Sequence, residues 1–102
     1  MEDTPYAEVW VEFLSREAGG RRNPVGLDDL GYRPHFRVGD GEYRGVEFVD
    51  RPEQSIEPGN ATFATVRFVY APQVDYRALV QGAQFEILEG GHTVGRGHVV
   101  RR

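Results

Sequence analysis

Few side chains in this sequence could carry nucleophilic or acid–base chemistry. The chain contains two serines, Ser15 and Ser55, three histidines, His35, His92 and His98, and no cysteine. A serine nucleophile needs a base within hydrogen-bonding reach, and no G-x-S-x-G motif marks such a serine. All five residues are compatible with surface or turn positions. We therefore expect no catalytic triad, and we expect that the protein is not an enzyme.

The sequence also lacks residues arranged to bind a metal ion or a nucleotide. His92, at the start of the last expected strand, and His98, within it, stand about 20 Å apart along the chain, which is too far to bind one ion. The acidic residues between positions 28 and 42 lack the spacing of a calcium loop and fit a solvated face. The glycines of residues 39–45 are wrongly spaced for a dinucleotide fingerprint, and no phosphate-binding loop of the Walker type occurs. The sequence predicts no metal and no cofactor.

Size and composition limit the class of protein. A chain of 102 residues suits one compact domain and is too short for a complete nucleotide-hydrolysing engine. Its net charge is −4, and its twelve basic residues are all Arg. No apolar run is long enough to span a membrane, and no signal peptide is recognisable. We therefore expect a cytoplasmic protein that does not enter a membrane.

The charge is distributed unevenly along the chain. Residues 1–50 hold six Arg and eleven acids, whereas residues 51–102 hold six Arg and five acids. Residues 90–102 contain three Arg and no acid. Because a local excess of positive charge attracts anions, we expect any anion site near the C-terminal end. The overall negative charge, in contrast, favours a protein over RNA as the partner.

Alternation of apolar and polar residues, which is typical of β-strands, runs through most of the sequence. In residues 8–13 it places Val9, Val11 and Phe13 on one face. Five further strands, separated by Gly- and Pro-rich turns, are expected at residues 35–38, 43–49, 61–70, 84–88 and 93–101. Residues 74–80 are ambiguous and could hold one helical turn. Six short strands indicate an all-β sandwich or a small barrel.

The turn at residues 89–92 is the strongest candidate for a binding element. Gly90 and Gly91 are adjacent, so they leave backbone N–H groups open to a bound anion, with Arg96 and Arg101 nearby in the sequence. The alternative is an ordinary Gly-Gly hairpin turn, followed by glycines that let a barrel strand bend. The residues alone favour this second interpretation.

Four segments of the sequence, taken together, match one known family. The segments FEILEGGHTVGRGHVV and AEVWVEFLSREAGGRRNPV contain its closing strand and its opening strand and loop. GYRPHF and PGN match two further motifs in the same order. The chain thus resembles the third domain of bacterial elongation factor Tu over nearly its whole length. The resemblance implies an antiparallel six-stranded β-barrel of that type over residues 6–102, preceded by a flexible leader at residues 1–5.

The resemblance also implies a function. In the full-length factor this domain follows a GTPase domain and a second barrel, touches the T-arm backbone of aminoacyl-tRNA and performs no chemistry. A stand-alone module of this kind would bind neither GTP nor a cofactor. Its expected partner is tRNA or another structured RNA. The rival prediction is a protein-interaction module that binds a translation factor or another protein and no RNA. We expect a monomer, because a closed barrel has no exposed strand edge.

The same resemblance assigns candidate site residues. The E-G-G turn of the family approaches the ribose–phosphate strand through its backbone amides, and its acid accepts a hydrogen bond from a 2′-hydroxyl. The predicted RNA-binding residues are Glu89, Gly90, Gly91, Arg33, His35, Arg44 and Arg96.

Four positions depart from the family pattern. Leu88 and His92 stand where the family has Arg, which removes two fixed positive charges. His35 replaces a Gln, and Arg44 replaces a Thr, which restores one charge. The predicted site is therefore less basic than the site of the family.

Overall fold

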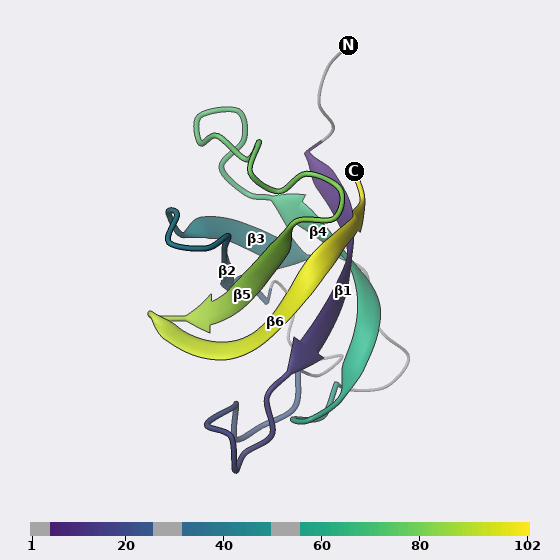
Figure 1. Ribbon diagram of the computed structural model, residues 1–102, viewed down its shortest axis with the longest axis vertical. Helices are drawn as coiled ribbons and strands as arrows, with labels where there is room; N and C mark the ends of the chain where they lie inside the picture. The colour runs from purple at the N-terminus through teal and green to yellow at the C-terminus, as the bar shows by residue number, and fades with distance from the viewer. Residues whose placement is uncertain (1–4, 26–31, 50–55) are drawn as a thin grey trace.

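Every predicted strand forms in the part of the chain that the computed structural model describes, which is residues 5–25, 32–49 and 56–102 (Figure 1). The strands are β1 (Tyr6–Phe13), β2 (His35–Arg37), β3 (Arg44–Phe48), β4 (Ala61–Phe68), β5 (Gln84–Glu89) and β6 (His92–Arg101). Their ends differ from the predicted ends by no more than two residues. Residues 74–80 contain turns and no helix.

The six strands are all antiparallel and close into a barrel in the order β1-β4-β3-β2-β5-β6, with β6 pairing back onto β1. The predicted all-β, six-stranded antiparallel barrel is therefore confirmed. The residues of the predicted leader, apart from Pro5, lie outside the described residues, as does Gly31 of the GYRPHF motif. The carbonyl oxygen of Pro5 accepts a hydrogen bond of 2.7 Å from the backbone N–H of Phe68.

The barrel interior is filled by the apolar residues that alternate along the strands. Val9, Val11 and Phe13 of β1 are buried, as their spacing predicts. On the opposite side of the barrel, the rings of Phe36 and Phe85 stack with their centroids 3.9 Å apart. Side chains from opposite walls of the barrel thus fill the core, as the close packing of protein interiors requires.

One strand has glycines where its neighbours have large side chains. A Cβ on Gly97 would overlap the carbonyl oxygen of Trp10 and lie 2.9 Å from the Phe85 ring. A Cβ on Gly95 would lie 2.5 Å from the carbonyl oxygen of Glu12. Because these side chains are missing, β6 can bend closely around β1, and Phe85 fills the space beneath it. This confirms the interpretation of the glycines that follow the β5–β6 turn.

The connection between β4 and β5 covers one end of the barrel. Tyr76 in this connection is buried and stacks on Phe68, with 4.5 Å between the ring centroids. Its hydroxyl donates a hydrogen bond of 2.6 Å to the carbonyl oxygen of Gly45. The guanidinium of Arg102 lies 4.6 Å from the centroid of the Phe68 ring and donates to the carbonyl oxygens of Tyr76 and Leu79. The end of β6 is thereby fastened to this cap.

We expect Gly97→Ala to lower the free energy of unfolding by about 3 kcal/mol, the upper end of typical overpacking costs. The new methyl group would overlap the backbone carbonyl of Trp10, which cannot move without disturbing the pairing of β1 with β6. Urea unfolding followed by circular dichroism measures the loss.

Gly39→Ala is the matched control for this substitution. A Cβ on Gly39 meets nothing within 4 Å, so the variant bears only the cost of a left-handed backbone at φ +57°, about 1 kcal/mol. Equal losses in the two variants would contradict a requirement for close approach at Gly97.

Candidate nucleic-acid interface

The turn between β5 and β6 is the two-residue hairpin that its adjacent glycines predict. Glu89 and His92 are paired across it, and Gly90 and Gly91 have φ angles of +58° and +85°. A positive φ at both central positions is typical of a type I′ turn, a conformation that favours glycine. Both glycines are exposed, so the backbone at the tip of this hairpin is open to a ligand.

The loop that follows β1 reaches this turn from a distant part of the sequence. Arg21 forms an ion pair with Glu89 through Nη1 and Oε2, across 68 positions. The Nε2 atom of His92 lies 2.7 Å from the carbonyl oxygen of Gly19. Because a carbonyl oxygen can only accept, His92 is the donor in this hydrogen bond. Residues 14–25 and 89–92 together form what we call the loop–turn surface.

Tyr32 connects the loop–turn surface to the barrel core. Its ring lies 6.3 Å from the ring of Phe13 and 5.2 Å from the ring of Phe48, measured between centroids. Its hydroxyl donates a hydrogen bond of 2.6 Å to Oε2 of Glu89, and the guanidinium of Arg21 lies 5.0 Å from its ring centroid. Burial, followed by the hydrogen bond to Glu89, raises the pKa of Tyr32 far above its ordinary value. Tyr32 therefore remains a hydrogen-bond donor at neutral pH.

His35 lies beside the β5–β6 hairpin, so it can belong to the same site as the turn. Its Cα partner on β5 is Leu88, and its ring lies 6.0 Å from the ring of Tyr43. The hydroxyl of Tyr43 in turn lies 3.9 Å from the point where Gly91 would carry a Cβ. Leu88 itself is only 1% exposed. The side chain at position 88 is therefore enclosed by the protein and does not contribute to the exposed surface of the hairpin.

Arg33 and Arg44 bind groups outside the β5–β6 hairpin. The Nε of Arg33 lies 3.0 Å from Oε2 of Glu47, a carboxylate that also binds Nη2 of Arg67 at 2.8 Å. The Nε of Arg44 donates to the carbonyl oxygen of Asp75 at 2.7 Å, in the connection that caps the barrel. The structure therefore brings together Glu89, Gly90, Gly91 and His35 and holds these two arginines elsewhere.

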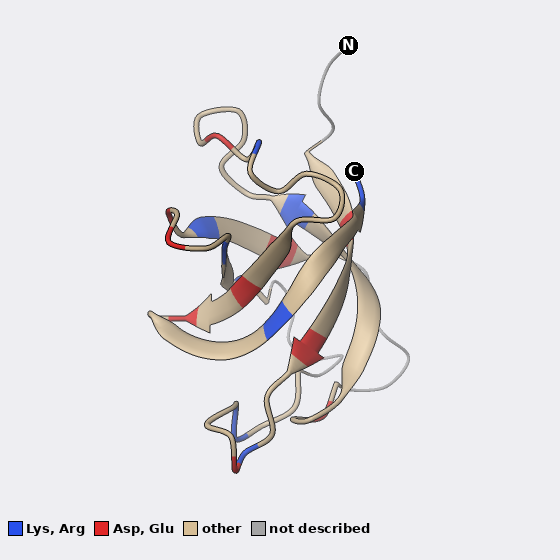
Figure 2. Cartoon of the chain, viewed as in Figure 1, with Lys and Arg blue, Asp and Glu red and all other residues tan. Residues whose placement is uncertain are grey.

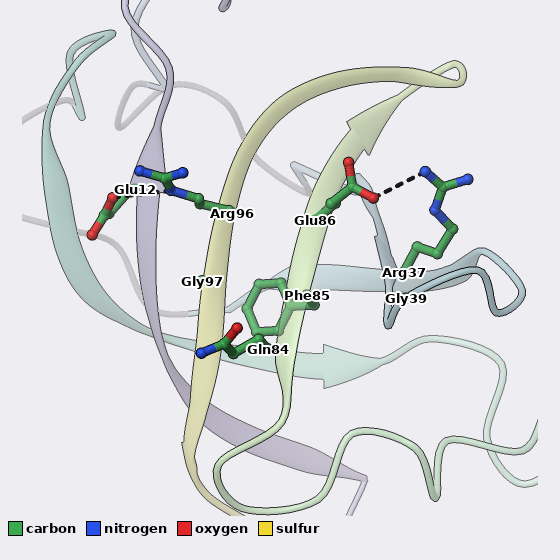
Figure 3. Close-up of a pocket in the computed structure, with 8 residues that line it drawn as sticks. All are labelled: Glu12, Arg37, Gly39, Gln84, Phe85, Glu86, Arg96 and Gly97. Carbon is green, nitrogen blue, oxygen red and sulfur yellow. Dashed lines mark hydrogen bonds and ion pairs between the residues drawn. The ribbon is translucent and has the colours of Figure 1, made fainter.

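Arg96 lies on the outer face of β6, beside a groove of about 510 Å³ (Figure 3). Its Nε is 3.4 Å from Oε2 of Glu12 on β1. Along the same row of the sheet, Nη2 of Arg37 binds Oε1 of Glu86 at 2.9 Å. Figure 2 shows acidic and basic residues alternating across these strands. The groove is therefore lined by charges of both signs, and the charge of Arg96 is balanced where the sequence suggested a local positive excess.

Two arginines that the sequence-based prediction did not include lie in the loop–turn surface. Arg16 and Arg22 are exposed, and the Nε of Arg16 donates to the carbonyl oxygen of Arg22 at 2.8 Å. Within the described ranges, no carboxylate forms an ion pair with either guanidinium. The signal that could have found them is the density of Arg in this loop, which has three within seven residues.

The fold defines the class of this protein as a closed antiparallel β-barrel with a polar loop–turn surface at one end. In the part of the chain that the structure describes, no group of three or more His, Cys, Asp or Glu side chains is arranged to hold a metal ion. The same ranges contain no helix with the length and apolar character needed to cross a membrane. A scan against models of known protein families finds no match for the chain.

The ion pairs of Glu47 should make stability depend on pH. Hydrogen bonds from Arg67 and then from Arg33 hold the pKa of the Glu47 carboxyl below its ordinary value of 4.5. Folding therefore favours the ionised form, whose contribution is complete above about pH 4.5 and is lost as the pH falls through the lowered value. We expect Glu47→Gln to melt below the wild type at pH 7, with a difference that shrinks in acid. Thermal melts over a pH series measure this, and a constant difference would contradict it.

Glu57→Gln is the control for this pH series. Glu57 is exposed, and its substitution makes the same change in net charge. We expect its melting temperature to follow that of the wild type at each pH.

Removal of the Glu89 carboxylate should loosen the loop–turn surface. Glu89→Ala leaves the hydroxyl of Tyr32 and the guanidinium of Arg21 without their shared acceptor, a loss of about 1–3 kcal/mol for groups that stay out of water. We expect trypsin to cleave after the arginines of residues 14–25 several-fold faster in this variant than in Glu57→Ala. Unchanged cleavage rates would mean that Glu89 does not hold the loop.

Proposed function

We propose that this chain is a non-catalytic, cytoplasmic RNA-binding module of the elongation factor Tu third-domain type, which acts in translation. Its ligand is the sugar–phosphate backbone of tRNA or of an RNA folded like it. One observation carries the proposal: the two Gly-Gly segments that resemble the family, residues 19–20 and 90–91, belong to one continuous surface. The contacts of Arg21 with Glu89 and of His92 with Gly19 join them.

The chemistry of the loop–turn surface suits a ribose–phosphate strand. Arg16 and Arg22 present guanidinium groups to solvent, and guanidinium binds phosphate with two parallel hydrogen bonds. The exposed backbone of Gly90 and Gly91 has no side chain that would keep a nucleic-acid strand at a distance. Tyr43, next to the turn, is 45% exposed, and the guanidinium of Arg37 lies 5.3 Å from its ring centroid, so an unpaired base could stack only on the part of the ring that Arg37 leaves open.

The proposed contact differs from the set of seven residues that the sequence predicts. It keeps Glu89, Gly90, Gly91 and His35, with Glu89 organising the loop through Arg21. It replaces Arg44 and Arg96, whose own partners lie elsewhere, with the arginines of the loop. Arg33 contributes only if its guanidinium leaves Glu47. Because 58% of its side chain is exposed, it can then reach a ligand in solvent.

Titration with tRNA at about 50 mM and about 200 mM salt tests the proposal, because phosphate contacts weaken steeply over this range. We expect binding at low salt and a steep decline with salt. The double variant Arg16→Gln/Arg22→Gln should bind more weakly and lower the slope of log K against log salt by about two, or one per lost phosphate contact.

The double variant Arg77→Gln/Arg101→Gln is the matched control, since it removes the same charge at sites outside the loop–turn surface. Its slope should equal that of the wild type. Absence of binding at about 50 mM salt would contradict the proposal. Equal weakening in both double variants would also contradict it, because it would mean general attraction to net charge.

A protein-interaction module without RNA binding is the second candidate function. The pairing of Arg33, Arg96 and Arg101 with carboxylates favours it, as does the net charge of −4. Paired charges attract a polyanion weakly but match the mixed charges of a protein surface. Lack of tRNA binding at low salt, together with direct binding of one purified translation factor, would select this function.

A further inference from the structure

An aromatic row crosses the outer face of three strands, on the side of the barrel formed by β4, β1 and β6. Phe63 is paired with Trp10, and Trp10 is paired with His98 on the next strand. The ring of Phe63 meets the ring of Trp10 edge-on, with 4.7 Å between the centroids. Phe63 is 67% exposed, the highest value for a large hydrophobic side chain among the described residues. This ring does not pack in the barrel core, so its position points to a contact outside the barrel.

Two ion pairs border this aromatic row, one on each side along the strands. Glu12 pairs with Arg96, and Glu8 pairs with Arg101. All four side chains are exposed, from 46% for Glu12 to 72% for Arg96. In both pairs the acid is on β1 and the base is on β6. The face therefore presents a negative column on β1 beside a positive column on β6, with Trp10 between the two acids and His98 between the two arginines.

Two adjacent columns of opposite charge form a surface that is complementary to itself. A two-fold axis that runs parallel to the strands, between β1 and β6, sets each column against the opposite column of a second copy. Glu12 then faces Arg96 of that copy, and Trp10 faces its His98. Neighbouring strands of one copy are about 4.8 Å apart. A long side chain on β1 can therefore contact both its neighbour on β6 and the opposite side chain of the second copy.

We propose that this chain forms a two-fold symmetric homodimer through its β4–β1–β6 face, with Trp10 and His98 beside the axis, Phe63 next to Trp10 on β4, and the Glu–Arg pairs at the rim. Aromatic anchors inside a polar rim are the usual arrangement of a protein–protein interface. A nucleic-acid strand does not fit this face, because the carboxylates of Glu8 and Glu12 repel phosphate. The dimer is independent of the RNA proposal, since it leaves the loop–turn surface free.

The proposed dimer differs from the sequence-based expectation of a monomer. That expectation follows from the absence of strand edges, and it holds for association by edge pairing. The proposed contact is between faces, where side chains and not backbone groups meet. Closure of the barrel does not oppose such a contact.

Sedimentation equilibrium at protein concentrations from about 1 μM to about 1 mM tests for the dimer. The upper limit detects a dissociation constant as weak as about 1 mM. Trp10 is the only tryptophan, so a blue shift of its fluorescence with concentration reports burial of this face. Phe63→Ser should weaken the dimer at least tenfold and abolish the shift. Val80→Ser, at a 54% exposed site outside this face, should leave both unchanged. A wild type that stays monomeric at about 1 mM overturns the proposal.

A charge exchange tests the proposed symmetry. The variant Glu8→Arg/Glu12→Arg carries two positive columns, and the variant Arg96→Glu/Arg101→Glu carries two negative columns. Each variant alone should remain monomeric, because like charges face each other across the axis. An equimolar mixture should form a heterodimer, which also demonstrates that both variants are folded. Dimerisation of either variant alone, or failure of the mixture to associate, would overturn this arrangement.

Discussion

The close approach of β6 to β1 is the constraint on which the rest of this structure depends. Gly95 and Gly97 carry no side chain at positions where a Cβ would collide with the backbone of β1. Because Gly95 and Gly97 have no side chains, β6 can bend and pair with β1 on one side and with β5 on the other. This pairing closes the sheet into a barrel. Phe85, stacked on Phe36, lies against Gly97, and Ile87 lies against Gly95. Closure and core packing are therefore two consequences of the same pair of small residues.

The position of the polar groups follows from this closure. Once β6 is in place, the β5–β6 turn lies within side-chain reach of the loop after β1, and the Glu89 carboxylate becomes the meeting point of Arg21 and Tyr32. Tyr32 belongs to both environments, since its ring packs on Phe13 and its hydroxyl binds Glu89. A partly buried carboxylate needs such donors, because it has lost part of its hydration. The loop is thereby ordered by a residue that the family pattern assigns to ligand binding.

The strands could be predicted because their signals are local. The alternation of Val9, Val11 and Phe13 requires one face to be buried whatever lies opposite, and two adjacent glycines in a hairpin have few other conformations. The candidate site could be predicted only in part. Gly90, Gly91 and Glu89 were found through a motif, whereas Arg16 and Arg22 were missed because their relation to the turn is made across the fold. Arg96 was placed near an anion site by its position in the chain, although its partner Glu12 stands 84 residues away.

The sequence by itself determined the class of fold, the positions of the strands and turns, and a net charge that is negative overall. Only the tertiary structure decided which charges are compensated and which remain available. An arginine has a long side chain that binds whichever carboxylate the strand register brings within reach, and register is set by pairing between distant segments. Thus Arg33 is held by Glu47 and Arg96 by Glu12, while Arg16 and Arg22 of the loop remain exposed. The aromatic row of Phe63 and Trp10 arises in the same way, because these two rings meet only where β4 pairs with β1.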